Sequence, residues 1–342
     1  MLQQQKHVLL IDQYGDYLGV ESEMLVIKSD TDEQRYPIDE LESVIITKPN
    51  GSISLLALNN LIQAGVGISI LNRHSDYSAE VSPCSGHALK LGKAQYLWRE
   101  SGIGALLAKR CILDKIWHQK FVLHEMKRRS RMMTLSPHDK SRITKSHNFL
   151  KSYHQQLKSM TLGDIGYEDV IFHHEARAAQ SYWNAIKAWL PKNFGFEGRK
   201  LRGTEADPIN AAFNYGYAIL ATRITHQLYG HGFNPNIGFL HASRENRASL
   251  TYDLIERYRQ RYVDVPVMRH AFSNGLWSLD DSGYLDSHTR KQIATCVLEA
   301  LDPRSSTGMI RIIDDIKTLR KSILEGTVWR PSEVLRSGLS PL

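Results

Sequence analysis

Short apolar runs separated by polar turn clusters fill the first 87 residues. The runs are rich in β-branched and aliphatic residues, which are typical of strands. They lie at 8–11, 17–20, 24–27 and 43–47. The period changes over 52–64, where apolar residues at 55, 58, 61 and 62 share one helical face that Gly65 ends. From Val66 the pattern returns to strand. Closely spaced strands with a single helix predict a small β-rich sandwich or barrel.

Turn residues cluster at 82–86, and the pattern beyond them is helical. Apolar residues recur at spacings of three and four, which predicts helices. These segments are 94–120, 120–133, 141–159, 171–190, 208–229, 248–262, 288–301 and 308–326. Asp207 and Pro208 are typical of an N-cap and a first helical turn. We predict an α+β protein with an N-terminal β-sandwich-like domain over 1–87 and a larger all-α domain over 88–342.

Composition places the chain among globular proteins. Hydrophobic residues make up 42% and charged residues 23% of the chain, which is ordinary for a soluble domain. Its apolar runs are far shorter than the roughly 20 residues that a membrane helix needs, and its start lacks the features of a signal peptide. The three cysteines, Cys84, Cys111 and Cys296, have no CxxC spacing, so we expect neither a zinc ribbon nor a redox dithiol. We expect a cytoplasmic protein with no membrane association.

The net charge of +7 is unevenly distributed along the chain. Residues 1–87 carry a net charge of −7, and residues 88–342 carry +14. Lysine and arginine side chains that contact phosphates release condensed counterions, so a basic domain is a candidate nucleic-acid binder. Its basic residues cluster at 127–131, 199–202 and 257–261. Each cluster alone is more often a solvated face, but three in one domain favour a DNA- or RNA-binding surface.

The segment 234–259 combines metal-ligand and anion-binding chemistry. His241 precedes Glu256 by 15 residues, and Ser243, Arg244 and Arg247 lie between them. Histidine with a carboxylate suits a divalent transition metal, so manganese is favoured over strict magnesium chemistry. Arginines beside such a site suit a phosphate substrate. From spacing alone, His241 is more often a core histidine that ends the apolar run 237–240.

Asp253 and Glu256 are three residues apart on a predicted helix, so both lie near one edge of it. Glu175 lies in a second candidate segment, ahead of small and aromatic residues that include Tyr182. A carboxylate at a tight helix interface is costly to bury unless it is paired or bound to a metal. Spacing alone favours a surface glutamate paired locally with Arg177 or His174.

A third segment follows the N-cap at Asp207. Asn210 and Asn214 are one helical turn apart and could bond another helix or a phosphate. From the sequence we interpret these asparagines as structural rather than functional.

Three segments in this order resemble the CRISPR-associated protein one family. They read IFHHEARAAQSYW, DPINAAFNYGYAIL and NPNIGFLHASRENRASLTYDLIERYR. The start LLIDQYGDYLGV and the late segment TLRKSILEGTVWRP extend the resemblance over essentially the whole chain. Three linked motifs are far more specific than any one of them.

The resemblance implies metal-dependent DNA integration with three metal ligands. Matched motif by motif, the ligands and catalytic residues fall on Glu175, His241 and Glu256. A second group of candidate site residues comprises Asp253, Arg244, Arg247, Arg259, Asn210 and Tyr182. The resemblance further implies Mn²⁺ or Mg²⁺ as cofactor and a homodimer formed largely through the N-terminal domain. The implied partners are CRISPR-associated protein two and double-stranded DNA, both as spacer precursor and as CRISPR repeat.

The expected reaction is attack of a spacer 3′-hydroxyl on a phosphodiester at the edge of a CRISPR repeat. Two alternatives stay open from the sequence. One is a metal-dependent endonuclease on branched or double-stranded DNA that uses the same site. The other is a non-catalytic DNA-binding scaffold, against which the intact Glu, His and Glu set argues.

Overall fold

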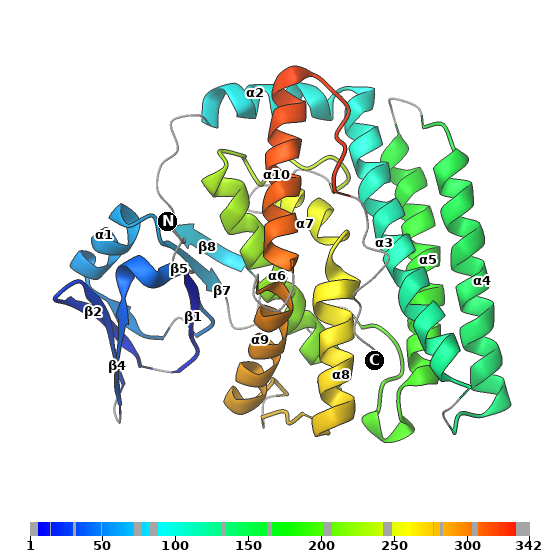
Figure 1. Ribbon diagram of the computed structural model, residues 1–342, viewed down its shortest axis with the longest axis horizontal. Helices are drawn as coiled ribbons and strands as arrows, with labels where there is room; N and C mark the ends of the chain where they lie inside the picture. Colours follow the sequence, from blue (N-terminus) through cyan, green and yellow to red (C-terminus); the bar gives the residue numbers. More distant parts are fainter. Residues whose placement is uncertain are drawn as a thin grey trace.

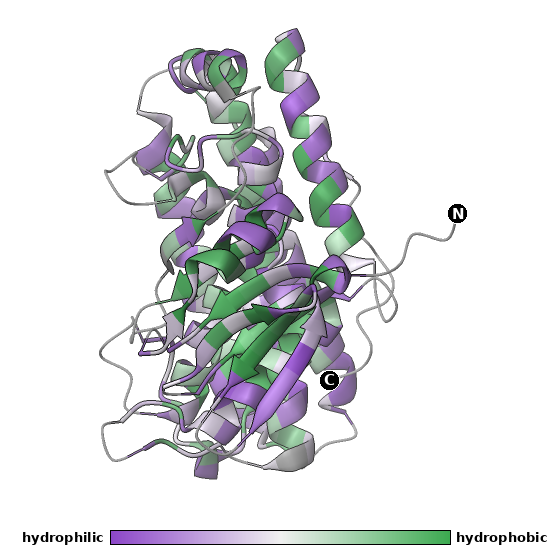
Figure 2. Cartoon of the chain, turned by 90° about the vertical axis from the view of Figure 1, so that its left-hand side faces the viewer, coloured by the Kyte–Doolittle hydropathy of each residue, from purple (hydrophilic) through white to green (hydrophobic). Residues whose placement is uncertain are grey.

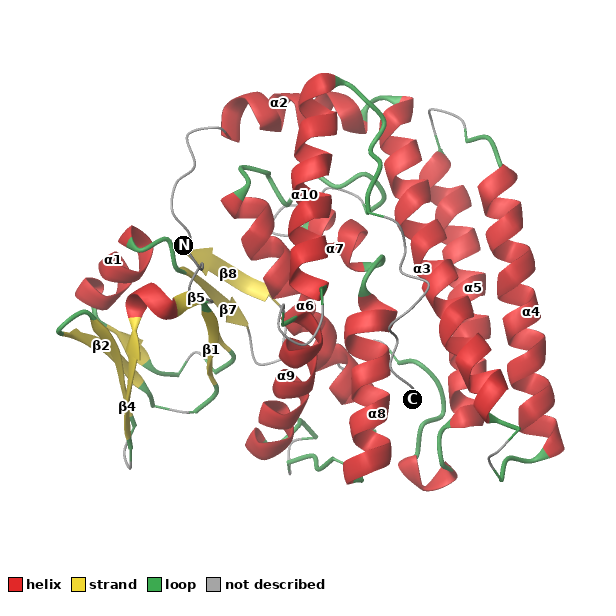
Figure 3. Ribbon diagram, viewed as in Figure 1, coloured by secondary structure: helices red, strands yellow, loops and turns green. Residues whose placement is uncertain are grey.

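The structure is a computed structural model of the chain. It describes residues 6–13, 15–29, 32–48, 50–71, 77–81, 88–131, 134–162, 166–200, 207–241, 248–275, 277–280, 283–302 and 307–332. The strands gather at one end of the molecule, in the blue segments of Figure 1. Figure 3 shows the same division, with yellow strands on one side of the red helices. A small β-rich part thus precedes a larger helical part, which confirms the predicted fold class.

The first sheet is built from short apolar strands and has the order β1-β5-β7-β8. β1 (His7–Ile11) pairs in parallel with β5 (Leu41–Ile46), and β5 pairs in parallel with β7 (Gly67–Leu71). β8 (Tyr77–Val81) joins β7 antiparallel at the edge. The apolar pattern predicted β1, β5 and β7, but it missed β8, whose sequence YSAEV has no continuous apolar run.

The second sheet is mainly antiparallel and has the order β4-β3-β2-β6. β2 (Tyr17–Glu21) and β3 (Met24–Lys28) form a hairpin, and β4 (Glu33–Pro37) pairs with β3. The two-residue strand β6 (Ser52–Ile53) pairs in parallel with β2. β4 is a charged, largely exposed edge strand, so no alternation of apolar residues marks it in the sequence.

The two sheets share one apolar core, which makes this part sandwich-like. Leu9, Leu25 and Val44 are buried in it, and Leu61 of α1 (Leu55–Gln63) packs there too. Helix α1 begins later than predicted, because Ser54 caps it and Ser52–Ile53 is a strand. Leu55 does not share the buried face, since it is 82% exposed.

The outer face of the first sheet packs on α6 (Pro208–Gly230). Ile45, Leu71 and Ala218 form one buried cluster there. Arg223 of α6 is buried, donates to Ser43 Oγ at 2.6 Å, and its guanidinium lies 2.6 Å from the carboxylate of Glu42. Because both faces of this sheet are covered, its strands read as continuous apolar runs rather than as alternating patterns. The sheet is therefore fastened to the helical part by both packing and charge.

Ten helices of at least seven residues occur in the described chain, and nine of them follow the strands. Besides α6, the helices that follow the strands are α2 (Ala88–Arg99), α3 (Gly102–Arg129), α4 (Pro137–Ser159), α5 (Tyr167–Trp189), α7 (Ser249–Ile255), α8 (Val265–Asn274), α9 (Ser287–Leu301) and α10 (Gly308–Glu325). Helices α3, α4 and α5 lie side by side on the far side of the molecule from the strands (Figure 1). Most helices are banded green and purple in Figure 2, as expected when one face is buried.

Three helix predictions need correction. The break expected at residue 120 does not occur, because α3 runs unbroken from Gly102 to Arg129 and begins after the turn at Ser101. The segment 248–262 is not one helix, since α7 ends at Ile255 and a π-helical turn follows at Gln260–Asp264. Helix α8 was not predicted. By contrast, Asp207 caps α6 as expected and accepts a hydrogen bond from the N–H of Asn210 at 2.8 Å.

The described helices include no segment that is both long and apolar enough to cross a lipid bilayer.

Candidate functional site

A buried carboxylate fixes the backbone and the imidazole of His241. Asp253 lies on α7 and is fully buried. Its Oδ2 accepts from the N–H groups of Phe239 at 2.5 Å and Leu240 at 3.0 Å. Its Oδ1 accepts from the N–H of His241 at 2.9 Å and lies 2.7 Å from His241 Nδ1. Because the carboxylate accepts, Nδ1 carries a proton, and Nε2 is left as the ring atom that could bind a metal.

The loop that carries His241 is held from several sides. Gln95 of α2 donates to the carbonyls of Asn234 at 2.8 Å and Ile237 at 3.0 Å. Tyr167 donates to the carbonyl of Phe239 at 2.6 Å. Gly238 lies so close to α7 that a Cβ atom there would be 2.7 Å from Ser249 Cβ. The backbone that leads to His241 is therefore fixed by α2, by Tyr167 and by its close packing against α7.

Glu175 and Glu256 meet at a single lysine. Lys115, in the middle of α3, contacts Glu175 Oε1, and its Nζ lies 2.6 Å from Glu256 Oε2. Glu256 directly follows α7, and Glu175 lies on α5. Three elements far apart in the sequence therefore bring the two glutamates together. The local partners expected for Glu175 are not used, since Arg177 lies over the ring of Tyr153 instead.

Two cations outweigh the cost of burying Glu256. Burial by itself would raise the pKa of Glu256, but Arg259 and Lys115 lower it below its usual value, and His241 adds to this effect. Burial likewise acts to lower the pKa of Lys115, yet Glu175 and Glu256 raise it above its usual value. Both carboxylate and ammonium are therefore held in their charged forms.

Arg259 links the glutamates to an open cleft. Its guanidinium lies 3.0 Å from Glu256 Oε1 and 4.8 Å from the centre of the Tyr217 ring. A cleft of about 470 Å³ begins here and is lined by four cations, Lys115, Arg199, Lys200 and Arg259. Glu175 also lines it, as do amide and aromatic side chains, namely Gln119, Gln180, Asn184, Gln260, Trp183 and Tyr217. Cations that lie over aromatic rings, as Arg199 and Arg259 do here, suit the phosphates of a nucleic acid.

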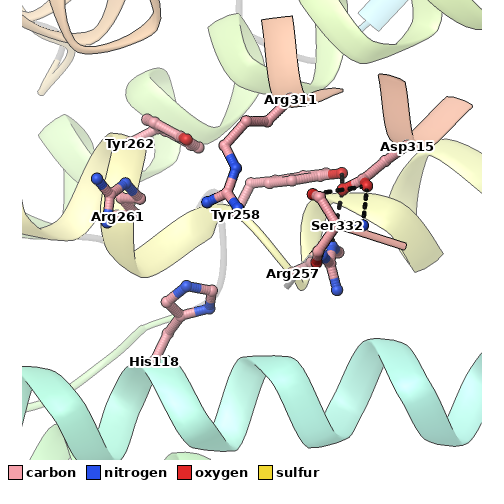
Figure 4. Close-up of a pocket in the computed structure, with 8 residues that line it drawn as sticks. All are labelled: His118, Arg257, Tyr258, Arg261, Tyr262, Arg311, Asp315 and Ser332. Carbon is pink, nitrogen blue, oxygen red and sulfur yellow. Dashed lines mark hydrogen bonds and ion pairs between the residues drawn. The ribbon is translucent and has the colours of Figure 1, made fainter. Parts of the chain in front are cut away.

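Arg257, the residue after Glu256, stabilises the interior of the protein. Arg257 is buried, its Nε donates to Asp315 Oδ2 at 3.0 Å, and it also contacts Asp114. Asp315 accepts from Tyr258 at 2.6 Å and from the N–H and hydroxyl of Ser332 at 2.7 and 2.8 Å (Figure 4). The cluster 257–261 was predicted to form part of a nucleic-acid surface. That prediction is wrong for Arg257, which stabilises the interior behind Glu256.

The second group of predicted site residues divides in the structure. Asn210 is buried, and all its hydrogen-bonding capacity goes to protein. Its amide donates to Gly198 and Asp207, and its oxygen accepts from Arg199 and the N–H of Lys200. It therefore orders the loop that carries Arg199 into the cleft.

Tyr182 is also buried, and its hydroxyl donates to Asp264 at 2.9 Å. It supports the core and does not line the cleft. Ser243, Arg244 and Arg247 lie outside the described residues, as does Cys84.

Glu175, His241 and Glu256, called the triad below, offer two carboxylates and one imidazole nitrogen. These donor groups suit a divalent cation. In the described part of the chain, no three or more His, Cys, Asp or Glu side chains form a metal-binding group as they stand. The cation between Glu175 and Glu256 is the Lys115 ammonium. The residues therefore fit a metal in kind, and a bound metal would require Lys115 to withdraw.

The sequence interpretation missed Lys115, although a signal was present. Lys115 follows Ile112 by three residues and Ala108 by seven, and it precedes Val122 by seven. It thus occupies the apolar stripe of a helix whose neighbours in that stripe are buried. A lysine in such a position is rarely buried unless it is paired.

Comparison with known proteins shows which family of sequences the chain resembles. The model of the family described as CRISPR associated protein Cas1 matches residues 9–298. A similar curated protein is CRISPR-associated endonuclease Cas1 2 of Saccharolobus solfataricus. It is 29% identical over 334 residues, which cover 94% of this chain and 96% of that protein.

Two solved structures share the fold. One, described as a casposase bound to integration product, has a TM-score of 0.79 at 22% identity, over 96% of this chain and 95% of that one. The other, from a Cas6-RT-Cas1–Cas2 complex, has a TM-score of 0.79 at 16% identity, over 98% of this chain and 37% of that one.

Proposed function

Because the chain belongs to the CRISPR-associated protein Cas1 family, we propose that it is a metal-dependent DNA integrase of CRISPR adaptation. It would insert spacer DNA into a CRISPR array. The observation that carries the proposal is the meeting of Glu175 and Glu256, from distant parts of the chain, at one cation beside a basic cleft. His241, fixed by Asp253, completes the donor set.

The reaction is a transesterification on phosphorus. The spacer 3′-oxygen forms a new bond to the phosphorus of the target strand as the bond to the leaving 3′-oxygen breaks. The proton of the attacking hydroxyl ends on the leaving oxygen, so no water is consumed. The target strand is therefore joined to the spacer rather than cut free.

Glu175, Glu256 and Nε2 of His241 would hold Mn²⁺ or Mg²⁺. When bound, such an ion supplies Lewis-acid stabilisation of charge on the phosphoryl and leaving oxygens. The protein's own part is to fix the donors. Asp253 sets the tautomer and ring orientation of His241, and Arg259 holds the second oxygen of Glu256.

The cleft would position the DNA strand. Arg199 and Lys200 are carried there by the loop that Asn210 orders. Contacts of this kind fix the register of the backbone without reading sequence. Double-stranded DNA, both spacer precursor and CRISPR repeat, is thus the proposed substrate class.

We also propose the assembly and location that the family suggests. The proposed partners are a second copy of the chain and CRISPR-associated protein two, which is named in the similar Cas1–Cas2 complex. The proposed location is the cytoplasm. We propose two domains, residues 1–87 and residues 88–342. The boundary between them follows the segment 82–87, which lies outside the described residues.

The second candidate function is a metal-dependent endonuclease, which the name of the curated relative favours. The same residues would serve it, with water in place of the 3′-hydroxyl. An assay with a labelled, pre-processed spacer and a supercoiled repeat plasmid separates the two. Integration yields plasmid covalently joined to the label, whereas hydrolysis yields cut, unlabelled plasmid. If metal-supplied protein with its partner only cuts, the integrase proposal fails.

A further inference from the structure

We propose that Lys115 is a built-in counter-cation that holds Glu175 and Glu256 together until a divalent metal ion displaces it. Lys115 would thereby set the affinity of the site for metal. This inference rests on the proposed function, because it takes the two glutamates as metal ligands. It adds a residue from α3 that belongs to none of the three motifs.

The contacts place Lys115 between the two carboxylates. Its ammonium contacts Glu175 Oε1 and lies 2.6 Å from Glu256 Oε2. The Lys115 side chain is 6% exposed and that of Glu256 is 3% exposed. Lys115 stands near the midpoint of a 28-residue helix, far from either end. Its backbone is thus fixed, and only the side chain is free to move.

An ammonium and a divalent ion cannot use these oxygens together. Two carboxylates in a poorly solvated site repel each other strongly unless a cation lies between them. Arg259 already occupies the other oxygen of Glu256. A metal bound to Glu175 and Glu256 would therefore need the oxygens that Lys115 holds, and it would repel the ammonium at close range. Binding of the metal is then an exchange of one cation for another.

The displaced side chain has a place to go. Lys115 lines the cleft that also contains Arg199 and Arg259. A lysine carries its charge on a flexible four-carbon stem, so the ammonium can swing while α3 stays fixed. On this account, the ammonium leaves the glutamates for the cleft when metal binds.

The test measures Mn²⁺ affinity directly, from the electron paramagnetic resonance signal of free Mn²⁺, at constant pH and ionic strength and without DNA. Lys115→Met removes the competing charge and should tighten Mn²⁺ binding by about tenfold or more, given the strength of a close charge–charge contact. Lys115→Arg keeps the charge and should not tighten it. Lys200→Met is the matched control, since it removes a lysine from the same cleft that contacts neither glutamate. It should change the affinity by no more than about threefold, because the Lys200 side chain is 37% exposed and its charge is screened by solvent.

A second readout follows the folded state. Without metal, Lys115→Met should unfold at a lower temperature than the wild type, since it removes the cation that lies between the two carboxylates. Saturating Mn²⁺ should raise its melting temperature more than that of the wild type. If Lys115→Met does not fold without metal, Lys115→Gln purified with Mn²⁺ carries the same expectation. Mn²⁺ affinity that is unchanged or weaker in both variants would overturn the inference.

Failure of the proposed function gives a different result. If Glu175→Gln and Glu256→Gln bind Mn²⁺ as tightly as the wild type, the glutamates are not metal ligands and the metal assignment itself fails. If these variants lose Mn²⁺ but Lys115→Met does not tighten it, the glutamates remain the site and only the role of Lys115 is wrong.

Discussion

Asp253 holds His241 by both its backbone and its ring, since one carboxylate oxygen lies 2.9 Å from the His241 main-chain nitrogen and 2.7 Å from Nδ1. The other oxygen accepts from the two preceding N–H groups. A ligand histidine is commonly oriented by a carboxylate on its second nitrogen. Asp253, which the sequence ranked below the triad, therefore determines where Nε2 of His241 points.

We expect Asp253→Asn to lower strand-transfer rate by about 10- to 100-fold, the usual cost of losing such an orienting partner. The asparagine amide cannot accept from all the N–H groups that face it, so the melting temperature should fall as well. Mn²⁺ affinity and strand-transfer rate, measured on protein shown to be folded, test this. Wild-type values of both would show that His241 needs no orientation.

Removing any one of Glu175, His241 or Glu256 should abolish detectable strand transfer while leaving most of the DNA affinity. The donors would act on the reacting phosphate, whereas the basic cleft would hold the DNA backbone. Alanine variants assayed for joining and for duplex binding measure the two effects separately. Glu197→Ala is the control, because Glu197 is exposed and its ion pair is with Lys187, which does not line the cleft. Integration at the wild-type rate by His241→Ala would refute the site assignment.

Tyr182→Phe should reduce stability more than catalysis. Its hydroxyl and that of Tyr217 donate to the buried carboxylate of Asp264 at 2.9 and 2.5 Å. Loss of one donor to a buried carboxylate costs about 1–3 kcal/mol of unfolding free energy. Chemical denaturation measures this cost, and strand-transfer rate per folded molecule should stay within about threefold of wild type. A larger loss of rate with intact stability would return Tyr182 to the active site.

Arg223→Ala should loosen the attachment of the first sheet to α6. The buried guanidinium serves Ser43 and Glu42, and removing one partner of a buried ion pair costs about 3–5 kcal/mol. Denaturant unfolding followed by tryptophan fluorescence reports the loss. Arg35→Ala provides the contrast, since Arg35 forms exposed ion pairs with Glu21 and Glu33 and should change stability little. Equal effects of the two substitutions would contradict the role of burial.

Acid should destabilise the protein in part through His118, which is buried, and His154, which is partly buried. Burial, with Arg261 and Arg311 nearby, lowers the pKa of His118 to about 3, and burial with Lys120 lowers that of His154 to about 4. The unfolded chain binds these protons near the ordinary pKa of 6.5, whereas the folded chain does not. The free energy of unfolding should therefore fall as pH decreases from about 6.5 toward 4.

His118→Leu should make this fall shallower. Melting temperatures of wild type and variant between pH 7 and pH 4 measure the difference, with the carboxylate contribution common to both. The same slope in both proteins would mean that His118 is protonated in the folded state.

The spacing of apolar residues predicted those strands and helices in which buried positions recur at a regular interval. Asp207 signalled the start of α6, because capping depends only on a few adjacent residues. The edge strand β4 was missed because its side chains face solvent and carry no apolar alternation. The run 248–262 looked like one helix because its apolar spacing continues past Glu256, but α7 ends at Ile255 and a π-helical turn begins at Gln260.

The sequence by itself determined the α+β division, the charge difference between its parts and the motifs that contain Glu175, His241 and Glu256. These properties depend on residue type and spacing, which a linear pattern records. Only the tertiary structure decided that Lys115 lies between the two glutamates, that Asp253 orients His241 and that Arg257 is interior. Each of these depends on which faces of α3, α5 and α7 meet. The cost of burying a charge is decided by partners that lie far away in the sequence, 141 positions in the case of Lys115 and Glu256.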